Sequence, residues 1–135
     1  MDKKLGFTLI ELLTVITILA ILSTITYSSY QSIVISTRRA DAQAELTKAQ
    51  IKQSSYHIIH PSFIDDAILL GLPTDDEFYT FSVVSASVNT YLLKAEAKAS
   101  NSQFKDESMC RVLLINQDNI KTNDGEMDNA SCWER

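Results

Sequence analysis

One carboxylate lies within the apolar N-terminal part of this 135-residue chain, and its charge is the first chemistry that the sequence offers. Glu11 directly precedes residues 12–37, a run that contains no Asp, Glu, Lys or Arg. A carboxylate near a bilayer centre costs on the order of 2.5–3.5 kcal/mol on insertion scales, so Glu11 requires a partner in that environment. The nearest basic side chains, Lys4 and Arg38, lie outside the apolar run.

The only two cysteines, Cys110 and Cys132, both lie in the last quarter of the chain. If this end of the chain lies outside the cytoplasm, a disulfide between them is the default interpretation, and two buried free thiols are the alternative. In the chain-entropy model, a disulfide that closes a loop of about 23 residues contributes on the order of 3 kcal/mol of stability. That contribution is a large share of the stability of a small domain.

Other residues that could support catalysis or metal binding lack the pattern that such chemistry needs. His57 and His60 share one side of a predicted helix, but no third metal ligand accompanies them. Asp75, Asp76 and Glu77 have no EF-hand spacing and indicate a solvated acidic loop. The chain has no nucleophile elbow of the G-x-S-x-G type. We therefore predict that the protein is not an enzyme and has no catalytic residue, metal site or cofactor.

The charge balance is acidic, with 12 basic and 17 acidic residues and a formal net charge of −5. Nucleic-acid binding draws on clustered Lys and Arg, so this balance argues against nucleic acid as a partner. A mildly basic helical face combines Arg38, Arg39, Lys48 and Lys52. This face could contact lipid headgroups just outside a membrane or an acidic loop of a neighbouring subunit. DNA is the least favoured of the three partners.

A long helix must position Glu11 and this basic face. Residues 7–60 contain no Gly or Pro, which predicts one helix of about 50 residues that Pro61 ends. Its first half is apolar on all sides and long enough to span a bilayer, which takes about 20 residues. Its second half is amphipathic. Positions at spacings of three and four predict a packing stripe: Ala42, Leu46, Ala49, Gln53 and Tyr56.

The second half of the chain predicts a sheet. Residues 78–84 and 90–98 are typical of strands, and residues 110–116 and 120–122 predict a third strand and a short fourth. In residues 90–98, Tyr91, Leu93, Ala95 and Ala97 share one face by alternation, and the other face carries Leu92, Lys94, Glu96 and Lys98. One turn of helix is expected at residues 65–70. The predicted class is α+β, with the amphipathic half of the helix packed on three or four antiparallel strands.

The N-terminal motif and several later segments resemble type IV pilins. A short leader with Lys3 and Lys4 ends in Gly6, Phe7 follows, and Glu11 is the fifth residue after the expected cut. The resemblance continues through residues 27–31 and 38–43 and through the late Asn116-Gln117, residues 120–122 and Cys132-Trp133. The later segments are most similar to minor pilins of the PilE type, and the implied structure is the type IV pilin fold.

The resemblance implies cleavage between Gly6 and Phe7 by a prepilin peptidase, followed by N-methylation of the Phe7 amine. Cleavage creates a cation that can pair with Glu11, either in the same subunit or in a neighbour. Removing one partner of such a buried pair costs roughly 3–5 kcal/mol, so the pair would fix the register of packed helices. Glu11 is therefore the predicted assembly residue.

Residues 1–6 are predicted as the leader, 7–37 as the membrane and filament-core helix, and 38–135 as the periplasmic globular domain. The basic leader favours a cytoplasmic N-terminus and a single pass through the bacterial inner membrane, before export into an extracellular pilus. Expected partners are the prepilin peptidase, the major pilin and other minor pilins, the inner-membrane assembly platform and inner-membrane lipid.

The predicted function is that of a minor pilin, a structural and assembly subunit of a type IV pilus, the class of filament used in cell adhesion and twitching motility. Alternatives are a pseudopilin of a type II secretion system and an adhesive or DNA-uptake pilin. Ala20 and Ser28 stand where many pilins carry Gly and Pro. Both replacements favour an unbroken helix, since Gly costs about 1 kcal/mol and Pro about 3 kcal/mol in a helix interior.

Overall fold

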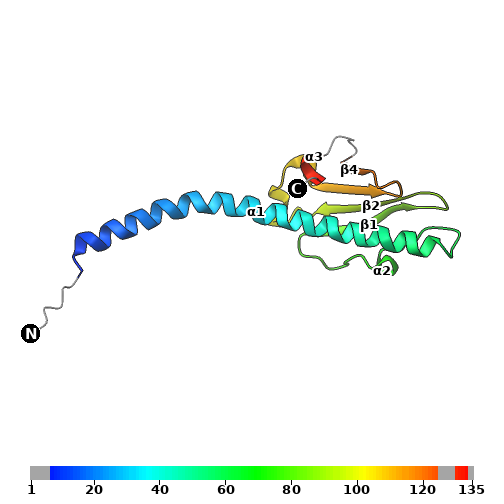
Figure 1. The fold of residues 1–135 in the computed structure, drawn as a ribbon, viewed down its shortest axis with the longest axis horizontal. Helices are drawn as coiled ribbons and strands as arrows, with labels where there is room; N and C mark the ends of the chain where they lie inside the picture. The colour runs from blue at the N-terminus through cyan, green and yellow to red at the C-terminus, as the bar shows by residue number, and fades with distance from the viewer. Residues whose placement is uncertain (1–6, 125–129, 134–135) are drawn as a thin grey trace, which may run out of the picture. The chain divides into compact units, whose positions relative to one another are not determined.

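The computed structural model of the chain describes residues 7–124 and 130–133, except for the side chains of residues 25, 26, 28 and 130. Figure 1 shows the order of the elements along the chain. They are α1 (Leu9–His57), α2 (Ala67–Leu70), β1 (Tyr79–Ala86), β2 (Tyr91–Ala97), η1 (Ser102–Lys105), η2 (Ser108–Cys110), β3 (Val112–Asn116), β4 (Lys121–Asn123) and α3 (Ala130–Trp133).

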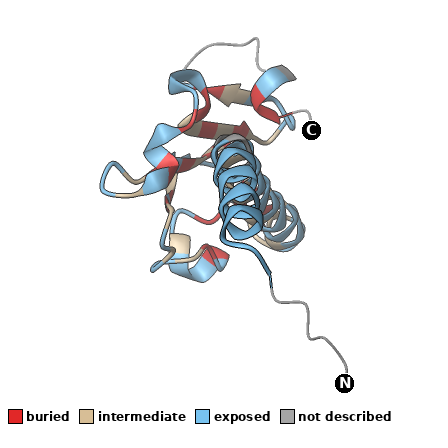
Figure 2. Cartoon of the chain, turned by 90° about the vertical axis from the view of Figure 1, so that its left-hand side faces the viewer, coloured by how far each residue is buried: buried red, intermediate tan, exposed pale blue. Residues whose placement is uncertain are grey.

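The predicted α+β class is confirmed, and so is the long N-terminal helix, which ends three residues before His60. The chain divides into two compact units, Met1–Val34 and Ile35–Arg135. The described part of the first unit is the N-terminal stretch of α1. The second unit contains the last turns of α1, the sheet and the short helices. Figure 2 shows buried positions on the strands and in α3, whereas the N-terminal turns of α1 are exposed throughout.

The four strands form one antiparallel sheet in the order β1-β2-β3-β4, so each strand pairs with the next along the chain. Phe81 pairs with Ala95, Ala95 with Leu113, and Leu113 with Asn123. The register of β1 shifts between Val83 and Ser85, next to the hairpin loop. The alternation predicted for β2 is confirmed, because its four small or apolar positions are all buried.

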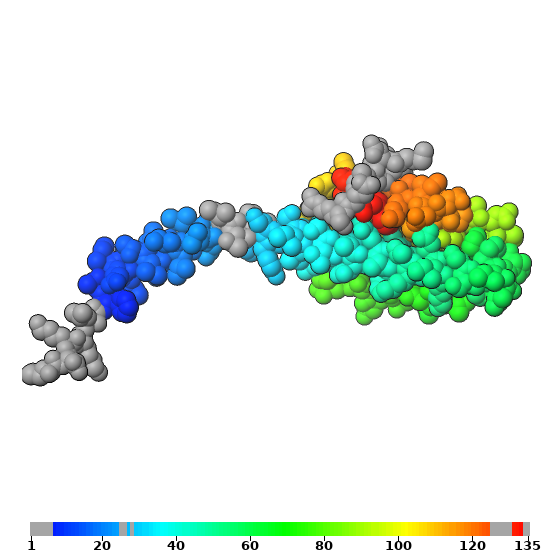
Figure 3. Space-filling view, in the orientation of Figure 1, coloured from blue at the N-terminus to red at the C-terminus, as the bar shows by residue number. Residues whose placement is uncertain are grey.

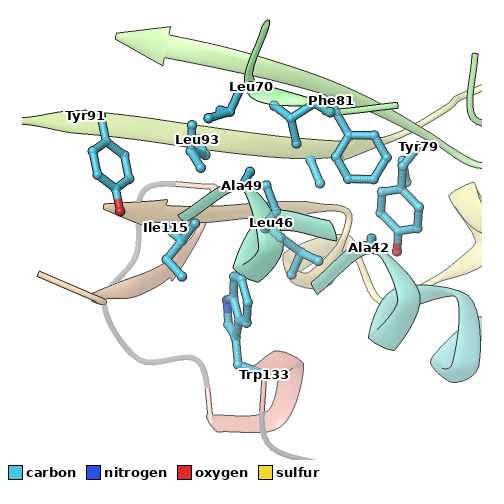
Figure 4. Packing of buried hydrophobic residues seen from close by; sticks show 14 of the residues in the cluster. Ala42, Leu46, Ala49, Leu70, Tyr79, Phe81, Tyr91, Leu93, Ile115 and Trp133 are labelled. Atoms are coloured by element: carbon cyan, nitrogen blue, oxygen red, sulfur yellow. The ribbon is translucent and has the colours of Figure 1, made fainter. Parts of the chain in front are cut away.

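The core lies between one face of this sheet and the packing stripe of α1. Leu46 and Ala49 on the helix are 0% and 3% exposed, and Leu93 and Ile115 on the sheet are fully buried. Figure 4 shows these side chains converging, with Trp133 closing the core from α3. The predicted stripe is therefore the buried face of α1, except that Tyr56 at its end is only partly buried.

A polar residue in the stripe has a specific partner. Gln53 is fully buried, and its amide exchanges two hydrogen bonds of 2.7 Å with the backbone N–H and C=O of Ile64. These bonds satisfy both ends of the buried amide and hold the loop after α1 against the helix. The loop continues into α2, where Asp66 caps the N-terminus and Gly71, at φ +81°, ends the helix in the left-handed region that favours glycine.

The C-terminal turn is attached to the domain by a covalent bond and by hydrogen bonds. Cys110 at the end of η2 is joined to Cys132 in α3, and both are buried. Gln43 of α1 donates to the Cys132 carbonyl at 2.6 Å, and the Trp133 indole donates to the Thr122 carbonyl at 3.3 Å. Figure 3 shows α3 in red against the orange surface of the last strands. The disulfide thus closes one side of the core.

Loss of this bond should lower the stability of Ile35–Arg135. Under oxidising conditions, Cys132→Ser is expected to lower the free energy of unfolding by about 3 kcal/mol. This change corresponds to a melting temperature lower by roughly 10–20 °C. Circular dichroism of parent and variant measures the difference, and reductant should make the two proteins melt together. Equal melting temperatures without reductant would contradict the stabilising role of the bond.

Candidate functional site

The N-terminal motif is organised around the first turn of α1. Thr8 directly precedes the helix, and its Oγ1 accepts a hydrogen bond from the backbone N–H of Glu11 at 3.3 Å. A Thr followed three residues later by Glu is the spacing of a capping box, a helix-start signal that sequence reasoning missed. The apolar run hid this signal, since Glu11 was interpreted through its charge and the processing motif, and Thr8 was not considered as a helix cap. Thr8 thus fixes where α1 begins, and Glu11 lies in its first turn.

The surface around Glu11 is apolar and uncovered. Every described side chain from residue 7 to residue 24 is exposed, including Phe7 at 86%. α1 contains a stretch long and apolar enough to cross a membrane. No ion pair involves Glu11 within the part of the chain that the structure describes. This surface therefore requires lipid or other helices to cover it, and the carboxylate requires a cation that the ion pairs of the described residues do not supply.

The hydroxyl groups of this segment are satisfied within the helix. Thr14, Thr17 and Ser23 donate to the backbone carbonyls of residues 11, 13 and 19 at 2.7–2.8 Å, and Thr24 donates to that of residue 21 at 2.7 Å. A hydroxyl that is bonded to its own helix costs less in a water-free environment than an unpaired one. These residues are consequently compatible with an apolar environment, and Glu11 differs from them in its charge.

The structure places the residues predicted from the sequence in two groups. Gly6 lies outside the described residues, whereas Phe7 and Glu11 lie together at the start of α1. Cys110 and Cys132 lie in the second unit and are bonded. His57 and His60 stack on Phe63 and Tyr56, with ring centroids 4.1 and 3.7 Å apart. No group of three or more metal-ligating residues occurs in the described ranges.

A buried ion pair joins α1 to the connection between β2 and β3. Arg39 donates to both carboxylate oxygens of Asp106, at 2.9 and 3.2 Å, and the two residues are 7% and 6% exposed. The prediction that Arg39 belongs to an exposed basic face is therefore wrong. Arg39 lies three residues before Ala42, at the spacing of the buried stripe, and its partner is 67 residues away in sequence. The spacing of Arg39 from Ala42 indicated a buried position, but no nearby part of the sequence identified Asp106 as its partner.

Gln103 completes the network under this pair. The Gln103 side chain is fully buried and donates to the Tyr79 hydroxyl at 3.0 Å and to the Ile35 carbonyl at 3.1 Å. Burial, opposed mainly by Arg39, raises the pKa of Asp106. Burial, with the Asp106 charge next, raises the pKa of Tyr79 well above its usual value. The network fixes residues 35–39 of α1 to the η1 segment. The sequence did not predict these contacts, because residues 99–109 have no strong periodicity.

Two family models match the chain. The prokaryotic N-terminal methylation motif matches residues 1–27. The family described as "Type IV minor pilin ComP, DNA uptake sequence receptor" matches residues 28–114, more than half of the chain. The second match includes the Arg39–Asp106 pair and Cys110 and ends before Cys132. No curated protein matches the chain.

Breaking the buried pair on one side should be more damaging than replacing it. Asp106→Leu leaves the Arg39 charge buried and unpaired, which should lower the free energy of unfolding by about 3–5 kcal/mol. Adding Arg39→Met removes that charge, so the double variant should regain part of the loss. Urea denaturation of Ile35–Arg135 at neutral pH measures both. A double variant no more stable than Asp106→Leu would show that the unpaired charge is not the cause.

Proposed function

This chain belongs to the type IV minor pilin ComP family, and we propose that cleavage between Gly6 and Phe7 prepares it for assembly through a charge pair at Glu11. It is a minor type IV pilin, from a family of structural subunits. The family match favours the pilus over the type II secretion pseudopilus. Before assembly, α1 holds the subunit in the inner membrane with its N-terminus in the cytoplasm and Ile35–Arg135 in the periplasm.

The observation that carries the proposal is the charge of Glu11 on an otherwise uncharged, exposed helix surface. Cleavage before Phe7 produces a positively charged amine four residues before Glu11 and two residues before the first residue of α1. The amine of the same subunit or of a neighbour then supplies the cation that residues 12–37 lack. Prepilin peptidase is the enzyme that this step requires, and N-methylation of Phe7 follows it.

Assembly moves α1 from lipid to a bundle of neighbouring pilin helices. The apolar side chains stay buried in both environments, so this transfer changes their free energy little. Glu11 changes more, because an unpaired charge among helices is strongly unfavourable and a paired one is tolerated. Neighbouring major and minor pilins, delivered by the inner-membrane assembly platform, are therefore the proposed partners, and the pair selects one register between them.

Replacing Glu11 should separate anchoring from assembly. Glu11→Leu is expected to leave the subunit processed and membrane-bound but absent from sheared filaments, because the amine of Phe7 loses its partner. Immunoblots of membrane and filament fractions measure both properties, with Thr17→Leu as the control in the same segment. Normal incorporation of Glu11→Leu would refute the charge pair.

A second candidate function is DNA reception, which the description of the matching family favours. The charge of the second unit opposes it, since Ile35–Arg135 holds ten basic and fifteen acidic residues. Contacts to phosphate are the main source of affinity for DNA, and they depend on clustered Lys and Arg side chains. Recognition of DNA would therefore have to rest on a local surface rather than on net charge.

Electrophoretic retardation of duplex DNA by the full chain in detergent tests this candidate. On the charge balance we expect no retardation at about 0.15 M salt, where weak surface electrostatics are screened. Lys105→Glu and Lys52→Glu provide matched changes at two exposed lysines. Retardation that persists at this salt concentration and is lost only in Lys105→Glu would establish the DNA candidate.

A further inference from the structure

The connection between β2 and β3 presents aromatic, apolar and basic side chains together. We call Phe104, Lys105, Met109 and Arg111 the η1–η2 surface. Phe104 and Met109 are 41% and 51% exposed, and Lys105 is exposed between them in sequence. The Arg111 guanidinium lies 4.1 Å from the centroid of the Phe104 ring, so a cation and an aromatic ring form one patch.

The buried residues beneath this surface hold it in place. Gln103, Asp106 and Cys110 alternate in sequence with the exposed residues and are at most 6% exposed. The Asp106 backbone carbonyl accepts from Arg111 Nε at 3.2 Å, and Cys110 is disulfide-bonded. Phe104 and Met109 are therefore presented outward by a fixed framework. An exposed apolar patch with such support indicates an interaction surface.

The charge of this surface differs from that of its surroundings. Within residues 102–111, Lys105 and Arg111 are accompanied by one exposed acid, Glu107, because the other acid, Asp106, is buried and paired with Arg39. Outside residues 38, 39 and 102–111, the unit Ile35–Arg135 holds six basic and thirteen acidic residues. A basic patch on an acidic unit favours a partner of negative charge at this place.

The segment that carries this surface contacts the first α1 residues of the second unit. Arg38 donates to Ser102 Oγ at 2.8 Å, and Gln103 donates to the Ile35 carbonyl at 3.1 Å. Arg38 also lines an open groove with Asp41, Glu45 and Asp76. Of the two basic residues of the η1–η2 surface, Lys105 is exposed and Arg111 is half-buried. The uncharged residues 12–37 number 26 and cover about 39 Å as a helix. A bilayer with its headgroups is about 40–45 Å thick.

We infer that the η1–η2 surface binds the anionic headgroups of the membrane that holds α1, before the subunit enters a filament. Lys105 and Arg111 contact lipid phosphates, while Phe104 and Met109 enter the interfacial layer between headgroups and chains. The uncharged residues 12–37 are thus long enough, as a helix, to cross such a bilayer between Glu11 and Arg38. This inference rests on the proposed membrane anchoring and adds a second, electrostatic contact to it.

Hydrogen exchange of the full chain in nanodiscs tests the inference. One bilayer contains phosphatidylcholine alone, and the other an equal mixture of phosphatidylcholine and phosphatidylglycerol. Amides of residues 103–111 should exchange at least about fivefold more slowly in the anionic bilayer. Each Lys or Arg side chain near such a surface strengthens its binding by about that factor. Lys105 makes no ion pair among the described residues, so Lys105→Glu should fold normally and lose this protection. Phe104→Ser should reduce it.

Lys52→Glu is the matched control, because Lys52 is also exposed and forms no ion pair within the described ranges. It should keep the protection. Equal exchange of the anchored parent chain in the two bilayers would overturn the lipid contact and leave anchoring intact. Protection of the same amides by duplex DNA in phosphatidylcholine nanodiscs would assign the surface to DNA instead. A chain that enters neither bilayer would overturn both the anchoring and this inference.

Discussion

Glu11 and the apolar helix surface around it set the requirement that the rest of the structure meets. A fully exposed apolar helix is stable in lipid or among other helices, but a carboxylate on it needs a cation wherever it lies in the hydrocarbon core or among packed helices. The hydroxyls of the same segment avoid this problem by bonding to their own backbone. We propose that the amine that cleavage creates at Phe7 solves it for Glu11. Processing would then change the electrostatics of the helix start as well as remove a leader.

The second unit contributes a fixed attachment to α1. The buried pair of Arg39 and Asp106 and the contact of Gln103 with the Ile35 carbonyl join one turn of the helix to the η1 segment. The disulfide at Cys110 secures the other end of that segment. A buried ion pair is weak evidence for stability, but it specifies one partner strongly, since each charge is costly alone. The exposed residues on the same segment consequently have a defined position.

Local periodicity predicted most of the fold, and long-range polar partners accounted for most of what it missed. The spacing of Ala42, Leu46 and Ala49 identified the buried face of α1, and strict alternation identified the buried face of β2. Arg39 also fits the helical spacing, but its charge led to an exposed assignment. Only a partner distant in sequence makes its burial favourable, and no sequence pattern identifies Asp106 in that role. At the N-terminus, the capping role of Thr8 was readable but was overlooked.

In the assembled filament, the Glu11 carboxylate should be paired with a Phe7 amine. Solid-state nuclear magnetic resonance can measure the distance between ¹⁵N at the Phe7 amine and ¹³C at the Glu11 carboxyl in filaments containing labelled subunits. A paired carboxyl carbon should lie within about 5 Å of that nitrogen, since the N···O separation in an ion pair is at most about 4 Å. A Glu11 carboxyl with no nitrogen of a Phe7 amine within that range would contradict the pairing.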